Sequence, residues 1–174
     1  MDAVTERLRT LEDYWHIVAL KTSYAELWNF GWGQPHDRAE QLAQLFVPDG
    51  VIDFGAFGLA SGQAEIVEMA KSWASPPGTD EQAPSAPEAG LSVHYAANPA
   101  ITVSGDDATA SFAGMIMATL PGQTAAWVAG RYDDTLVRTE SGWRFQRVGF
   151  TYALVTPFTG PGWVAQRMPA LTAD

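Results

Sequence analysis

The part of the sequence that decides the fold is residues 91–154, which read LSVHYAANPAITVSGDDATASFAGMIMATLPGQTAAWVAGRYDDTLVRTESGWRFQRVGFTYAL. Three short turn signals, at 104–107, 121–123 and 139–142, divide this stretch. The segments between them are long and read as strands, namely 91–98 with its continuation 100–103, then 108–120, 124–138 and 143–154. Strands joined by such short turns predict a meandering antiparallel sheet.

Helices are predicted before this sheet. Residues 3–30 read as one long helix, because apolar and small residues recur at helical spacing, at Leu8, Leu11, Trp15, Val18, Thr22, Ala25 and Trp28. Leu20, Tyr24 and Leu27 widen this stripe, which we expect to press against the sheet. A second helix begins at Pro35 and Asp37, where residues 37–40 have the form of a capping box.

Between these helices and the sheet, Pro48, Asp49 and Gly50 read as a turn, 51–57 as a strand and 63–73 as a short helix. Helices first and strands after predict an α+β fold, with a curved sheet and the long helix enclosing a cavity as in a cone. We expect one domain over 1–174, with an irregular tail at 156–174. Residues 75–90 are a flexible linker or a functional lid, since their length and composition fit both.

Composition excludes several classes of protein. Of 174 residues, 47 % are hydrophobic and 17 % charged, as in a protein that forms a core. The net charge of −10 argues against nucleic-acid or anionic-membrane partners. There is no cysteine, so disulfides, zinc–cysteine sites and thiol nucleophiles are excluded. No signal peptide or membrane span is visible, so we expect a cytoplasmic protein.

Aromatic residues are the unusual part of the composition: seven Trp, eight Phe and five Tyr. They could form a core or line a ligand cavity. His16, His36 and His94 lack the spacing of metal ligands, and motifs for a dinucleotide, a phosphate loop or a serine nucleophile are absent.

Four segments in this order resemble the nuclear transport factor 2-like superfamily and its SnoaL-like group: 45–51 (LFVPDGV), 94–99 (HYAANP), 130–134 (GRYDD) and 142–145 (GWRF). Within the group the chain is most similar to lyases of the scytalone dehydratase, bile acid dehydratase and hexachlorocyclohexane dehydrochlorinase type. The resemblance implies a cone-shaped fold and acid–base chemistry with no cofactor and no metal. It implies that His94 is the histidine that these enzymes pair with an aspartate.

The chain departs from that pattern at charged positions. The aspartate is replaced by Asn29, and the lysine of the dehydrochlorinase by Tyr24, where the bile acid dehydratase has a tyrosine. An arginine of the dehydrochlorinase falls on Val148. The pocket implied by the resemblance is therefore less charged.

His94 is the strongest candidate for chemistry, because an imidazole can move a proton near neutral pH. A structural role is the alternative. The Asn29 side chain could accept from the His94 ring and fix its tautomer, or bind a substrate oxygen, or simply end the helix. Tyr24 is a candidate acid or a core residue, and Tyr132 and Tyr152 are further candidate acids.

The resemblance also implies a substrate-binding wall of apolar and aromatic residues, namely Trp28, Phe54, Val128, Tyr132, Val148, Phe150 and Tyr152. The carboxylates of Asp53, Asp133 and Asp134 are expected to be exposed charges on strands, because ionised carboxylates are rarely buried unpaired.

These observations predict a lyase or isomerase without a cofactor, a dehydratase or cyclase, acting on a hydrophobic small molecule with a carbonyl or a ring. His94 would remove a proton, Tyr24 or another tyrosine would supply one, and Asn29 would orient His94 or the substrate. The alternatives are a non-catalytic partner subunit, like the small subunit of ring-hydroxylating dioxygenases, or a protein that binds an apolar ligand. We expect a homodimer or homotrimer, because the outer side of the long apolar strands needs cover.

Overall fold

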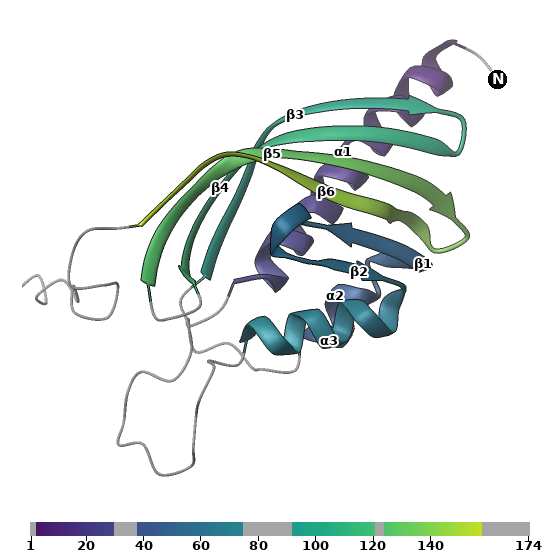
Figure 1. Cartoon of the computed structure of the whole chain (residues 1–174). Helices are drawn as coiled ribbons and strands as arrows, with labels where there is room; N and C mark the ends of the chain where they lie inside the picture. Colours follow the sequence, from purple (N-terminus) through teal and green to yellow (C-terminus); the bar gives the residue numbers. More distant parts are fainter. Residues whose placement is uncertain (1–2, 30–37, 75–91, 121–123, 158–174) are drawn as a thin grey trace, which may run out of the picture.

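The computed structural model describes residues 3–29, 38–74, 92–120 and 124–157. Three α-helices and six strands follow the predicted order, so the α+β prediction is confirmed (Figure 1). The elements are α1 (Ala3–Leu27), α2 (Ala39–Ala43), β1 (Phe46–Asp53), a 3-10 turn (Gly55–Phe57), β2 (Leu59–Ser61), α3 (Gln63–Ala74), β3 (Ser92–Ser104), β4 (Asp107–Leu120), β5 (Thr124–Thr139) and β6 (Gly142–Pro157). No helix in these ranges is long and apolar enough to cross a membrane.

The six strands form one curved, open sheet in the order β2-β1-β6-β5-β4-β3. The predicted meander, β3 to β6, pairs antiparallel throughout, and only β1 pairs parallel, with β6. Figure 1 shows α1 running along the hollow side of this sheet, with α2 and α3 beneath β1 and β2. The helices and the inner side of the sheet therefore share one core.

Only the C-terminal part of the predicted stripe on α1 faces the sheet, where Tyr24, Leu27 and Trp28 are buried. Leu8, Leu11 and Trp15 are exposed. The buried residues instead follow a second stripe of the helix, through Asp13, Ile17, Lys21, Tyr24 and Trp28. Two residues of that stripe, Asp13 and Lys21, are polar. A search for apolar residues at helical spacing could not identify the stripe, because Asp and Lys are expected to be exposed unless they have a buried partner.

The first strand also differs from its prediction. Pro48, Asp49 and Gly50 were predicted to form a turn before the strand, but they lie within β1. They occupy an irregular stretch, where the pairing with β6 shifts between Phe46 and Val51. Pro48 has no backbone N–H to donate, and in this stretch there is no regular ladder of hydrogen bonds for it to interrupt. The strand ends at Asp53, and the predicted residues 55–57 form the 3-10 turn.

Strand β3 is continuous from Ser92 to Ser104, and its interruption has a local cause. Asn98 has a positive φ of 52°, and the pairing with β4 shifts between Ala97 and Ala100. Asn tolerates this left-handed conformation better than most residues, so a bulge forms here. The predicted capping residue Asp37, the segment 75–90 and most of the tail 156–174 lie outside the described residues; α2 begins at Ala39.

The core is built largely from rings. Tyr24 contacts Trp28, Phe46, Tyr132 and Phe145 edge-on, at centroid distances of 5.6–6.3 Å. Two glycines make room for a further ring: a Cβ on Gly114 or Gly130 would lie 2.4 or 2.7 Å from atoms of the Phe150 ring. Phe150 thus lies against bare backbone, which only glycine permits at these two positions.

Candidate active site

Strand β3 carries His94 on the inner face of the sheet. His94 pairs with Ile116 on β4, which pairs with Val128 on β5. The three side chains therefore form one row that faces the helices. His94 as a residue is partly buried.

Two hydrogen bonds fix His94. The Asn29 Oδ1 accepts from the backbone N–H of His94 at 2.7 Å, and the Ser92 hydroxyl lies 3.2 Å from the imidazole Nδ1. The expected bond from Asn29 to the ring is thus a bond to the main chain, which ties the end of α1 to β3. Ser92, two residues before His94 on the same face, takes the place next to the ring.

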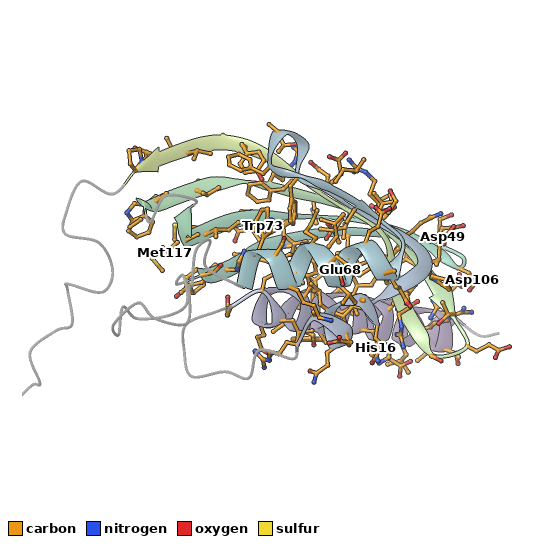
Figure 2. All side chains as sticks on the ribbon, turned by 60° about the horizontal axis from the view of Figure 1, so that its bottom comes forward. His16, Asp49, Glu68, Trp73, Asp106 and Met117 are labelled. Carbon is orange, nitrogen blue, oxygen red and sulfur yellow. The ribbon has the colours of Figure 1, made fainter. Side chains whose placement is uncertain are left out.

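One aromatic ring contacts the imidazole, and two further rings pack against that ring. The Trp28 ring lies 6.3 Å from His94, and the Trp28, Phe54 and Trp73 rings lie 5.7–5.9 Å from one another. We call His94, Trp28, Phe54 and Trp73 the His94 cluster. Figure 2 shows Trp73 at the end of α3, beside the strands. Trp73 is 44 % exposed, so this ring lies at the edge of the cluster where an apolar molecule can reach it.

The surroundings keep His94 uncharged. Burial and, to a smaller extent, the positive charge of Lys21 together lower the pKa of the imidazole to about 3. Asn29 is an uncharged amide, so it cannot stabilise an imidazolium as a carboxylate would. At neutral pH the ring is therefore a neutral donor and acceptor, and the same lowered pKa makes it a weaker base than an ordinary histidine.

The candidate tyrosine acids lie at different depths. Tyr24 is buried behind the Trp28 ring, and burial raises the pKa of its hydroxyl well above the usual value. Tyr132 is equally buried, and burial raises the pKa of its hydroxyl strongly too. Tyr152 is only partly buried, packs 4.8 Å from the Phe57 and Phe150 rings, and has a pKa raised by burial to about 12. Of the three phenols, Tyr152 is the most accessible.

The remaining residues predicted for the substrate wall are buried in the core: Phe54, Val128, Tyr132, Val148 and Phe150. Val128, Tyr132 and Phe150 share the inner face of β5 and β6, since Tyr132 pairs with Phe150 across these strands. Whether they touch a substrate stays a prediction.

Asp134 corrects the expectation that the strand carboxylates are exposed. Its side chain is fully buried and lies 2.9 Å from the Lys21 Nζ, which is 1 % exposed. We call these two residues the Lys21–Asp134 pair. Four rings enclose the ammonium, the nearest being Tyr132 at 3.6 Å and Tyr24 at 4.4 Å. Burial opposes both charges: it lowers the pKa of Lys21 and raises the pKa of Asp134.

This pair was not predicted from the sequence. The available signal was the spacing of Lys21, which lies three residues before Tyr24 and seven before Trp28, on one face of a helix. The other two carboxylates lie near the surface as expected. Asp53 accepts from Arg147 at 2.9 Å, and Asp133 pairs with Arg131.

Two hollows open on another side of the molecule. One, of about 460 Å³, lies between α1, α2 and Arg144, and the second, of about 380 Å³, lies beside it near Phe46 and Gln63. His94 lines neither, so we place the candidate site by its chemistry and not by these hollows. In the described ranges no group of three or more His, Asp or Glu could hold a metal ion.

Solved structures share this fold. A hexachlorocyclohexane dehydrochlorinase of type 2 has a TM-score of 0.71 at 17 % identity, with 90 % of this chain and 96 % of that chain covered. A protein from Novosphingobium aromaticivorans named as a candidate scytalone dehydratase has a TM-score of 0.66 at 17 % identity, covering 88 % and 92 %. A nuclear transport factor 2-like protein with a cystatin-like fold, from the same organism, has a TM-score of 0.60 at 27 % identity, covering 86 % and 88 %.

No curated protein matches the chain. These structural likenesses show the fold. The family model of the SnoaL-like domain matches residues 9–149, which is most of the chain. The matched range includes every residue of the His94 cluster. The chain therefore belongs to the SnoaL-like domain family.

Proposed function

We propose that this protein is a lyase or isomerase without a cofactor, which acts on a hydrophobic small molecule with a carbonyl or a ring. The observation that carries the proposal is a neutral, partly buried imidazole within an aromatic cluster, held by Ser92 at its ring and by Asn29 at its backbone. Dehydratase and dehydrochlorinase names among the structural relatives support the same class.

His94 is the proposed base. When Nδ1–H donates to the Ser92 hydroxyl, the lone pair on Nε2 remains available to a substrate. This nitrogen takes a proton from the carbon next to a carbonyl, and the C–H electron pair forms an enolate. In an elimination the enolate reforms the carbonyl and expels a hydroxide from the neighbouring carbon.

A phenol is the proposed acid, which protonates the departing hydroxide so that it leaves as water. The proton on His94 then returns to the phenol, so that both groups recover their starting state. Tyr152 suits this role because it is the most exposed of the three tyrosines. Tyr24 suits it because the similar bile acid dehydratase has a tyrosine at this position. In an isomerisation His94 returns the proton to a different carbon and nothing leaves. Rings around His94 orient the substrate, which supplies much of the acceleration when few charges are present.

The test is a screen of hydrophobic hydroxycarbonyl and cyclic compounds by mass spectrometry, which separates loss of water from conversion without a change of mass. We expect His94→Ala to lower turnover by about 100-fold or more, because a general base contributes that much. His16→Ala is the matched control, since His16 is exposed on α1 (Figure 2). Tyr152→Phe and Tyr24→Phe identify the acid by which of them lowers turnover.

A protein that binds an apolar ligand without converting it is the second candidate, favoured by Asn29 standing where a carboxylate would make His94 a stronger base. Compounds that quench tryptophan fluorescence of Trp28 and Trp73 but come back unchanged after long incubation would overturn the enzyme and support this candidate.

A further inference from the structure

An apolar stripe on α1 faces away from the core. Leu8 is 54 % exposed, Leu11 59 % and Trp15 67 %, and we call these three residues the α1 stripe. The helix buries its other face through Ile17, Lys21 and Tyr24. Large apolar side chains exposed next to one another mark a contact surface.

The spacing of the α1 stripe indicates what covers it. Leu8, Leu11, Trp15 and Val18 recur at alternating steps of three and four residues, and Val4 continues the spacing at the N-terminal end. This is the heptad pattern with which two helices interlock along their length. The partner of the α1 stripe is therefore a helix.

Flanking charges indicate which helix. Arg7 and Glu12 lie on opposite flanks of the α1 stripe, five residues apart, and both are exposed. In two parallel helices this offset places Arg7 of one helix beside Glu12 of the other. Neither residue forms an ion pair within the described part of the chain, whereas the neighbouring Arg9 pairs with Asp106. The stripe and its charges thus complement a second copy of themselves.

We propose that the α1 stripe is an interface between two copies of this chain, in which the two α1 helices pack parallel to each other. A two-fold axis along the helices closes such a contact, which is the commonest symmetry of protein dimers. From Leu8 to Val18 the contact spans about 15 Å, at 1.5 Å per residue. An interface this short is at the small end for stable complexes, so we expect a weak dimer with a dissociation constant on the order of micromolar.

The outer face of the sheet is the competing surface. Tyr95, Met115, Ala129 and Leu154 form one row across β3 to β6, and the three large side chains are about half exposed. From the sequence, the outer sides of these apolar strands are expected to be covered. A test must therefore separate association through the helix from association through the sheet.

The experiment is sedimentation velocity of the full chain between about 1 and 100 μM, the range that brackets micromolar affinity. We expect a dimer whose dissociation constant rises about tenfold or more in Leu11→Glu, because a charge in the heptad seam opposes pairing. Arg7→Glu weakens the dimer, and Arg7→Glu/Glu12→Arg restores it. The control Tyr95→Lys/Met115→Lys leaves the helix contact intact. These changes are on exposed positions, and circular dichroism checks that each variant is folded.

Two outcomes overturn the proposal. One is a wild-type chain that stays monomeric at the highest concentration, which would assign the stripe to a different protein. The other is a dimer that the sheet variant dissociates and Leu11→Glu leaves unchanged. Failure of either kind leaves the proposed activity untouched, since the α1 stripe lies on the side of the helix opposite the core.

Discussion

The Lys21–Asp134 pair and the His94 cluster both bury titratable groups between α1 and the sheet, but they treat charge in opposite ways. The pair keeps two charges and lets them neutralise each other at 2.9 Å. The cluster keeps none, because burial holds the imidazole neutral and the neighbouring Asn29 is an uncharged amide. One region fixes the helix to the sheet through charge, and the other holds a neutral imidazole beside apolar rings. A neutral site of this kind suits the uncharged substrate of the proposed function.

Breaking the pair has the largest expected effect on stability. Lys21→Met leaves Asp134 buried without its partner, and we expect a loss of about 3–5 kcal/mol in the free energy of unfolding. Lys21→Met/Asp134→Leu removes both charges and recovers most of this loss. Urea unfolding measures both values. The matched control is Asp13→Asn/Arg138→Gln, which removes the other ion pair between α1 and β5, with Arg138 near the surface.

A single variant that is as stable as the wild type would contradict the assignment of both residues as charged. It would mean that Asp134 is protonated in the folded protein.

The same residues show which of these features can be predicted from the sequence. The meander, the order of elements and the strand that carries His94 depend on turn signals, strand composition and spacing along the chain, and these predictions are confirmed. The Lys21–Asp134 pair joins residues 113 positions apart in the numbering, and nothing near either residue specifies the other. Polar residues on the buried stripe also made the predicted face wrong in the N-terminal part of α1, at Leu8, Leu11 and Trp15. Local patterns determine elements, whereas long-range pairing of unlike residues determines which face of an element is buried.

Ring packing between the two regions gives the next largest effect. A Cβ on Gly114 would lie 2.4 Å from the Phe150 ring and 2.9 Å from the Tyr132 ring. We expect Gly114→Ala to cost about 1–3 kcal/mol of stability, because an overpacked core must shift its rings. Urea unfolding measures this loss. Ala113→Gly, on the outer face one position before, is the control for backbone entropy and should cost less than Gly114→Ala.

The pH dependence of stability distinguishes the neutral His94 from the charged Lys21–Asp134 pair. The pKa of His94 is near 6.5 in the unfolded chain and about 3 in the folded one, so only the unfolded chain binds a proton between these values. Stability is therefore lost as the pH falls below 6.5, by about 1.4 kcal/mol per pH unit. Between pH 6.5 and 5 we expect wild type to lose roughly 2 kcal/mol more than His94→Gln.

Comparing the two proteins isolates His94, because Asp134 contributes with the opposite sign. Burial raises its pKa, so between about pH 4 and 6 the folded protein binds the extra proton and gains stability as the pH falls. Parallel stability curves for wild type and His94→Gln across this window would mean that the imidazole titrates normally and is open to water.

The smallest expected effect concerns the tautomer of the imidazole. Ser92→Ala removes the hydroxyl 3.2 Å from Nδ1, and we expect a loss of about 0.5–1.5 kcal/mol, the usual value of one hydrogen bond. Nitrogen NMR of the His94 ring is the informative measurement. If Nδ1–H donates to Ser92, wild type carries its proton on Nδ1, and the variant shifts toward the Nε2 tautomer. A wild-type ring already protonated on Nε2 would instead make Ser92 the donor and Nε2–H a donor to substrate. His94 would then act first by polarising a carbonyl, and the base of the reaction would have to be sought elsewhere.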